Sequence, residues 1–276
     1  MKVKLSDGAR STAYRDGDRT ILKGKNHSTY ERFIDDVNNL NAIKRYINNI
    51  QIPTNARVIH PSKEFPFGGM SYDYIPGRSL QPKSINDNNI DNIAYKLADF
   101  LKQLEVIKPE NIFPDFDKKE VIREEKEQIN ISYQLITPYL NEEQKEKLKV
   151  WVNDYLNYLD SIKEFNVIHG DLWFENIIID DNQQELVGII DFEQAKVFDK
   201  AVDYTSILWM GKDFVIKILQ RNKLPKDYIN TLLLFNVRTK VLKFDYILKG
   251  LHKETPTDRL KELNKKLNQY FDSNLD

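Results

Sequence analysis

The 276-residue chain contains no cysteine, which excludes disulfide bonds, thiolate metal sites and a cysteine nucleophile. Only four histidines are present, so there is little material for a histidine-rich metal centre. No apolar run approaches the roughly 18 residues that a membrane-spanning helix needs, and we expect no membrane partner. The first residues, MKVKLSDGAR, lack the apolar core of a secretory signal peptide. We therefore expect a cytoplasmic protein.

The chain has almost no net charge, because 41 Lys and Arg balance 42 Asp and Glu. This neutrality argues against a nucleic-acid partner. The total nevertheless hides a split: residues 1–77 carry 12 Lys and Arg against 8 Asp and Glu, residues 78–210 carry 15 against 26, and residues 211–276 carry 14 against 8. A basic first section suits a polyphosphate, and an acidic middle section suits a metal or a cationic acceptor.

The first 77 residues are predicted to form a small β-rich lobe. Two Asp-Gly turn signals, at 7–8 and 16–17, divide its first short runs. Apolar residues spaced by three and four positions predict an amphipathic helix over 30–47. The expected strands are 2–5, 11–14, 20–23, 57–60 and 70–75.

Residues 78–276 are predicted to form a larger helical lobe with an inserted β-hairpin. Two β-branched runs, 177–179 and 186–190, flank the turn sequence Asp-Asp-Asn and predict the hairpin. Pro225 and Pro256 are expected in the first turns of the last two helices. The other expected helices are 88–104, 118–140 and 142–165. The fold class is therefore α+β with two lobes, 1–77 and 78–276.

The strongest motif is VIHGDLWFENIIID at 167–180, followed by GIIDFE at 188–193. Asp171 and Asn176 lie in a loop after an apolar strand, and Asp191 ends the second strand of the hairpin. We expect the hairpin to bring Asn176 and Asp191 together at its open end. Amide and carboxylate oxygens are hard ligands that suit Mg²⁺ bound with phosphates. Asp171 is then free to accept a hydroxyl proton, which is the division of labour in phosphoryl transfer.

Together these motifs resemble those of the aminoglycoside phosphotransferase family, which shares the protein-kinase-like fold and includes macrolide, choline, homoserine and methylthioribose kinases. As in that family, Gly170 replaces the arginine of the protein-kinase motif His-Arg-Asp, and Glu193 stands where protein kinases have the glycine of Asp-Phe-Gly. The resemblance implies that Asp171 is the catalytic base and that Asn176 and Asp191 bind Mg²⁺. It implies a supporting role in the loop for His169.

Two further aspartates follow these motifs. The segment VFDKAVDY at 197–204 resembles the Gly-Asp-Pro…Asp segment of the family, with Phe198 and Lys200 in place of the usual glycine and proline. We expect Asp199 and Asp203 to cap and brace the next helix rather than to contact substrate.

The phosphate-binding part of the small lobe is a weaker match. Residues 8–14, GARSTAY, would form the loop over the triphosphate, with backbone N–H groups and the Ser11 hydroxyl cradling oxygens, although the loop has one glycine. Lys23 is the candidate for the α- and β-phosphates, with Lys25 as the alternative and a solvated strand-end lysine as the simpler interpretation. The resemblance implies a helix carboxylate as partner of Lys23. The candidates are Glu31, Asp35 and Asp36. Spacing favours Asp36 and reach favours Glu31, and we expect Asp36 to be the partner.

The segment GMSYDYIPGRSL at 69–80 resembles the hinge between the lobes. It implies that the Asp73 carbonyl and the Ile75 N–H bind the purine edge. An ordinary strand and turn would fit the same residues. Because backbone groups make these contacts, the donor is ATP or GTP.

The acceptor is the least determined part. The acidic segment 110–127 is either a wall for an amine-rich acceptor or a solvated helix face interleaved with lysine and arginine. Four aromatic residues of the C-terminal helices either line an acceptor site or belong to the core: Trp209, Phe235, Phe244 and Tyr246.

We therefore expect an enzyme that moves the γ-phosphoryl group of ATP or GTP to a hydroxyl of a small molecule, with Mg²⁺ as cofactor. An antibiotic, aminoglycoside or macrolide, is the leading acceptor. The alternatives are a choline, homoserine or sugar kinase and a non-catalytic nucleotide-binding protein. A protein kinase fits less well, because there is no Ala-Pro-Glu motif and little room for an activation loop between Phe192 and Asp203.

Overall fold

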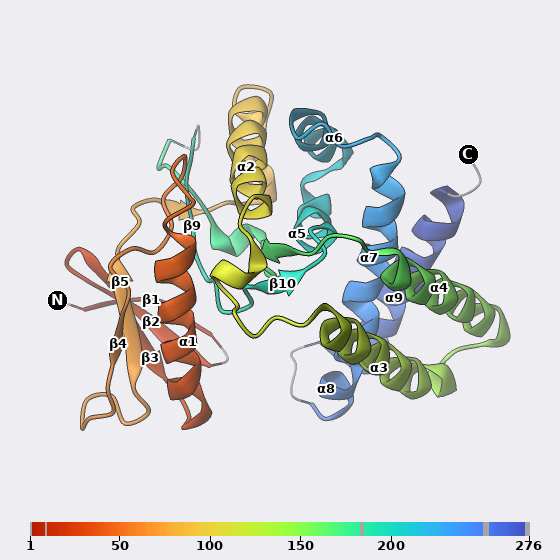
Figure 1. Cartoon of the computed structure of the whole chain (residues 1–276), viewed down its shortest axis with the longest axis horizontal. Helices are drawn as coiled ribbons and strands as arrows, with labels where there is room; N and C mark the ends of the chain where they lie inside the picture. Colours follow the sequence, from red (N-terminus) through yellow and green to blue (C-terminus); the bar gives the residue numbers. More distant parts are fainter. Residues whose placement is uncertain (1, 9, 183–184, 251–253, 274–276) are drawn as a thin grey trace.

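An antiparallel sheet and one helix build the first lobe of the computed structural model, which describes residues 2–8, 10–182, 185–250 and 254–273 (Figure 1). The sheet order is β1-β2-β3-β5-β4. Helix α1 (Ser28–Ile43) lies beside β4 and β5 and buries Phe33, Val37 and Leu40. The strands are β1 (Val3–Asp7), β2 (Ser11–Asp16), β3 (Arg19–Gly24), β4 (Arg57–Ile59) and β5 (Gly69–Asp73).

Helices dominate the rest of the chain, on the side opposite the sheet in Figure 1. The two-lobed α+β class predicted from the sequence is confirmed. The α-helices are α2 (Ile90–Glu105), α3 (Lys118–Ile136), α4 (Glu142–Ser161), α5 (Ala201–Ser206), α6 (Lys212–Arg221), α7 (Tyr228–Val241), α8 (Phe244–Leu248) and α9 (Pro256–Ser273). Short 3₁₀ helices are η1 (Pro82–Ser84), η2 (Pro109–Asn111), η3 (Thr137–Tyr139), η4 (Phe174–Asn176) and η5 (Leu208–Met210).

The starts of two helices test the prediction that Pro225 and Pro256 lie in their first turns. Pro256 begins α9, as predicted. Pro225 does not begin α7, which starts at Tyr228; the proline lies in the preceding turn, where its carbonyl accepts the Tyr228 N–H at 3.1 Å. The prediction placed this start about one turn too early.

Two small sheets carry the segment that holds Asp171, Asn176 and Asp191. The predicted hairpin is present as β8 (Ile177–Ile179) and β9 (Leu186–Ile189), and β6 (Arg78–Ser79) pairs with β8. Strand β7 (Asn166–Ile168) pairs with β10 (Lys196–Phe198), a strand that the sequence patterns missed. Gln51, which follows α1, accepts the Ile189 N–H at 2.9 Å and donates to Val187 at 3.1 Å. The sheet lobe is thereby hydrogen-bonded to the hairpin.

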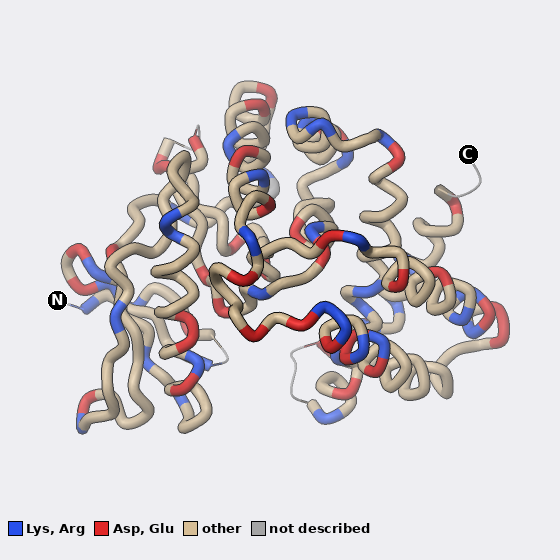
Figure 2. The backbone as a smooth tube through the Cα atoms, in the orientation of Figure 1, with Lys and Arg blue, Asp and Glu red and all other residues tan. Residues whose placement is uncertain are grey.

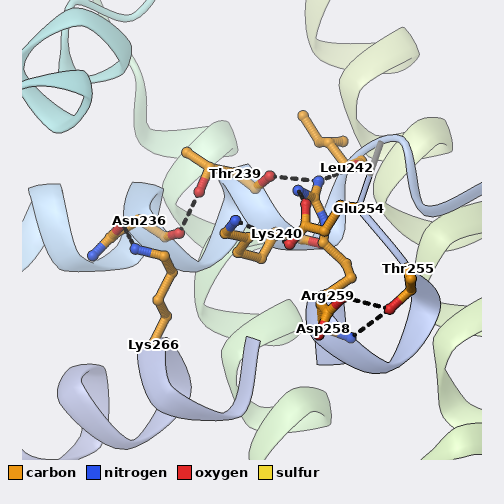
Figure 3. A network of polar contacts seen from close by, with 9 residues as sticks. All are labelled: Asn236, Thr239, Lys240, Leu242, Glu254, Thr255, Asp258, Arg259 and Lys266. Carbon is orange, nitrogen blue, oxygen red and sulfur yellow. Dashed lines mark hydrogen bonds and ion pairs between the residues drawn. The ribbon is translucent and has the colours of Figure 1, made fainter. Parts of the chain in front are cut away.

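The last helix fastens the end of α7 through one arginine (Figure 3). Arg259 of α9 donates to the backbone carbonyls of Thr239, Lys240 and Leu242, each at 2.8 Å, and pairs with Glu254 at 3.0 Å. Carbonyls at a helix C-terminus lack intrahelical partners, and a guanidinium satisfies them well. Among the described residues, no helix has the length and apolar character needed to cross a bilayer.

Candidate active site

The loop after β7 is supported by a buried, neutral histidine. The backbone N–H of Asp171 donates to Nδ1 of His169 at 3.3 Å, and Nε2 of the same ring lies 3.0 Å from the Ile190 carbonyl. Burial lowers the pKa of His169 to about 4. The ring is therefore uncharged at neutral pH, and its contacts fit the supporting role that we expected.

Gly170 allows the loop to turn where a larger residue would collide. Its φ is +79°, and a Cβ added to it would lie 2.3 Å from the Gln194 carbonyl oxygen. That oxygen belongs to the backbone and cannot swing away. The clash explains why this chain has glycine between His169 and Asp171.

Asp203 holds the same loop from α5. Its two carboxylate oxygens accept the backbone N–H groups of His169 and Gly170, both at 2.8 Å. Burial is the main reason why the pKa of Asp203 is raised to about 7. The expectation that Asp203 braces its own helix is corrected: it braces the catalytic loop. Asp199 does cap α5, because it accepts the Ala201 N–H at 2.7 Å.

Asn176 and Asp191 both line one cleft, and their surroundings fit a divalent cation. The Asn176 side-chain nitrogen donates to the Asp171 carbonyl at 2.8 Å, which leaves the amide oxygen as the possible ligand. Desolvation, followed by the charges of Glu193 and Asp171, raises the pKa of Asp191 to about 6. A buried carboxylate in acidic surroundings is stabilised when a cation binds. Mg²⁺ needs only one or two protein oxygens when phosphates supply others.

This cleft, a cavity of about 660 Å³, runs between the sheet lobe and the hairpin. Ser11, Asp36 and Ile75 line it, as the predicted nucleotide contacts require. Ala9 of the expected phosphate loop lies outside the described residues. Asp73 is not among the lining residues of this cleft, so the structure does not bring it together with the other predicted nucleotide contacts. The predicted contact is through its backbone carbonyl, whereas its side chain binds Arg19, Thr54 and Asn55.

Lys23 is on the other face of the sheet. Side chains alternate along a strand, and in β3 the cleft is lined by Thr20 and Leu22. The Lys23 ammonium lies 5.7 Å from the centre of the Phe65 ring. The expected pair of Lys23 and Asp36 is therefore not formed in this structure. The alternative, Lys25, pairs with Asp7 and the Gly8 carbonyl.

Asp36 is the one of the three candidate helix carboxylates that reaches the cleft. Asp36 is buried, whereas Glu31 and Asp35 are exposed. One of its oxygens, Oδ2, has no hydrogen-bond partner among the described residues. Desolvation and then the charges of Glu193 and Asp191 raise the pKa of Asp36 to about 7. The choice of Asp36 placed the right residue at the cleft, with a different set of neighbours from the one expected.

Replacing Asp36 with asparagine is expected to stabilise the nucleotide-free protein in a pH-dependent way. A carboxyl whose folded-state pKa is raised stabilises the fold when protonated, and that stability is lost as pH rises towards the folded-state pKa. The gain in Asp36→Asn should therefore grow between pH 5 and pH 7, by up to about 1.4 kcal/mol per pH unit, and level off above. Urea unfolding in EDTA measures it, with the exposed Asp35→Asn as control. A gain that is independent of pH would contradict the proposed titration.

The acidic segment forms exposed ion pairs and also lines a cavity. Arg123 pairs with Glu120 and Glu127 on the exposed face of α3, where red and blue alternate in Figure 2. Arg123 and Glu127 also help, with Asp115 and Glu124, to line a second cavity of about 1060 Å³. Its other walls are α1 and β10, the strand paired with β7.

The four aromatic residues also divide. Phe235 and Phe244 are core residues, and Tyr246 is half exposed. Trp209 packs against Trp173 and Phe174, with ring centres 5.6 and 4.9 Å apart. No role is predicted from the sequence for Trp173, which is 42% exposed two residues after Asp171. Its position within the motif was the available signal.

Comparison with known proteins identifies the family. The model of the phosphotransferase enzyme family matches residues 3–224. No match is found among curated proteins. The structure of wild-type aminoglycoside 2'-phosphotransferase-IIIa with GDP is 20% identical, with a TM-score of 0.79 over 98% of this chain and 93% of the other. Macrolide 2'-phosphotransferase MphH from Brachybacterium faecium is 14% identical, with a TM-score of 0.67 over 97% and 91%.

The structure of aminoglycoside phosphotransferase APH(2'')-Ib with ADP is 22% identical, with a TM-score of 0.71 over 97% of this chain and 92% of the other. At these identities, the three structures show a shared fold. The family model covers most of the sequence, including the whole segment from the first sheet to the catalytic hairpin. The chain belongs to the phosphotransferase enzyme family.

Proposed function

We propose that the protein transfers the γ-phosphoryl group of ATP or GTP to a hydroxyl of a small molecule. The main observation in support of this proposal is that Asn176 and Asp191 line one cleft and that Asn176 is hydrogen-bonded to the Asp171 backbone. Asp171 accepts the hydroxyl proton and orients the attacking oxygen. Burial raises the pKa of Asp171, which makes its carboxylate a better proton acceptor.

The donor occupies the cleft between the lobes. Ile75, Tyr74 and Gly77 line its hinge side, and Ser11 lies at its sheet side. Asn176 and Asp191 would hold Mg²⁺, which neutralises charge on the phosphate oxygens when bound. Related structures bind GDP or ADP, and both donors therefore belong in the test.

An amine-rich antibiotic is the leading acceptor. The second cavity has room for a molecule of that size, and its lining is acidic on balance, with five carboxylates against two cations, Arg123 and Lys196. One wall, β10, pairs with the strand that leads into the catalytic loop. The structures named in the comparison include aminoglycoside and macrolide phosphotransferases, and macrolides are the second class to try.

The test is Mg²⁺-dependent phosphoryl transfer by the purified protein, with ATP and GTP offered separately. The acceptors are aminoglycosides, macrolides, choline, homoserine and sugars, and transfer is read as labelled product. Expression in a susceptible bacterium then scores resistance to each drug. Product with metabolic acceptors alone would replace the antibiotic assignment. Nucleotide binding without transfer to any acceptor would leave a non-catalytic binding protein.

A further inference from the structure

The nucleotide cleft is short of positive charge. Five carboxylates are among its lining residues, whereas Arg78 is the one Lys or Arg in that set within the described chain. Arg78 itself donates to the Asp181 carbonyl. Lys23 faces away, and Lys25 is engaged by Asp7. A triphosphate bound here needs a cation from elsewhere. The carboxylates are Asp7, Asp36, Glu175, Asp191 and Glu193.

Arg10 is not itself a lining residue, but it is placed at the edge of the cleft to provide that cation, because its partner Glu193 and the next residue, Ser11, both line it. It stands in the expected phosphate loop, directly before Ser11 of β2, and its guanidinium reaches Glu193 at 2.8 Å, 183 residues along the chain. The charge of Arg10 is also close enough to favour the ionised forms of Asp36 and Asp191. Arg10, and not Lys23, is therefore the cation whose charge acts on Asp36.

We propose that Arg10 binds the phosphates of the nucleotide in place of a β3 lysine, and that Glu193 positions it. The inference rests on the proposed nucleotide-dependent function. A guanidinium stays charged and can make two parallel hydrogen bonds to phosphate oxygens. Glu193 takes the position of a glycine in Asp-Phe-Gly, and glycine has no side chain with which to hold an arginine.

The experiment compares binding of ADP and of adenosine, and of GDP and guanosine, by calorimetry in Mg²⁺. The variants are Arg10→Gln, Arg10→Lys and Lys23→Gln. The matched control is Arg32→Gln, which removes an exposed positive charge from α1 in the same lobe. Arg10→Gln should weaken diphosphate binding about tenfold or more, because charge-assisted hydrogen bonds are lost. Nucleoside affinity should stay the same, Arg10→Lys should retain part of the affinity, and the other variants should change it less than about twofold.

The possible failures are distinguishable. If the wild type binds diphosphates and Lys23→Gln weakens them while Arg10→Gln does not, the proposal for Arg10 is overturned and the proposed function stands. Equal weakening of nucleosides and diphosphates by Arg10→Gln would assign Arg10 a structural role and also overturn the proposal. If the wild type binds neither ADP nor GDP, the nucleotide-dependent function itself fails, and the role of Arg10 fails with it.

Discussion

Asp171→Asn is expected to lower kcat for phosphoryl transfer by about 10²–10⁴. Asparagine has nearly the same size as aspartate but cannot accept the hydroxyl proton. The loop should keep its shape, since the backbone around residue 171 is held by His169 and Asp203. The loss should therefore fall on the chemical step, with little change in nucleotide affinity.

Steady-state kinetics and ADP calorimetry on the same preparations separate these effects. Asp87→Asn, an exposed aspartate before α2, is the matched control and should keep wild-type kcat. Because burial raises the pKa of Asp171, the wild-type rate should fall as pH is lowered towards that pKa, since the protonated carboxyl is no base. The residual rate of Asp171→Asn should lack this fall. A variant with wild-type kcat would show that another group takes the proton.

The juxtaposition of the candidate site residues could be predicted because they are close in the sequence. Asp171 and Asn176 are five positions apart, and the hairpin returns the chain to Asp191 through local β-pairing. Periodicity also placed Asp36 correctly, because a helix face is defined by three- and four-residue spacing. These inferences needed no knowledge of distant contacts.

The predictions that failed depend on which face of a strand a residue occupies, or on contacts between residues far apart in the sequence. A shift of one position along a strand moves a side chain to the opposite face of the sheet. Lys23 therefore lies beside Phe65 instead of the cleft. Asp203 binds backbone groups more than 30 positions before it, and Arg10 binds Glu193, which lies 183 positions later in the sequence. Nothing in the spacing of these residues indicates such pairs, because tertiary packing alone brings them together.

The largest stability loss is expected at another distant pair, Glu125 of α3 and Arg238 of α7. The guanidinium makes two bonds to the carboxylate, at 2.6 and 2.9 Å, and the Tyr155 hydroxyl donates to the same carboxylate at 2.9 Å. Both charged side chains are less than 10% exposed. Burial alone would raise the pKa of Glu125, but Arg238 holds it below the usual range.

Arg238→Met is expected to lower the free energy of unfolding by about 3–5 kcal/mol, because it leaves a buried carboxylate without its hydrogen-bonded cation, with Lys196 as the remaining nearby positive charge. Methionine retains much of the apolar volume beside Phe198 and Phe235. Denaturant unfolding followed by circular dichroism measures the loss. Arg123→Met, the same substitution at an exposed pair on α3, should have a much smaller effect.

Adding Glu125→Gln to Arg238→Met tests whether the loss comes from the unpaired charge. The glutamine is neutral and can still accept the Tyr155 hydroxyl, so the double variant should regain on the order of 2 kcal/mol. The single variant should also recover as pH falls, because without Arg238 the folded-state pKa of Glu125 rises and protonation favours the fold. The double variant has no such titration. If both variants lost equal stability at every pH, packing around Arg238, and not its charge, would hold α3 against α7. The same packing would then support β10, the strand that ends at Phe198 and pairs with β7 beside the loop of Asp171.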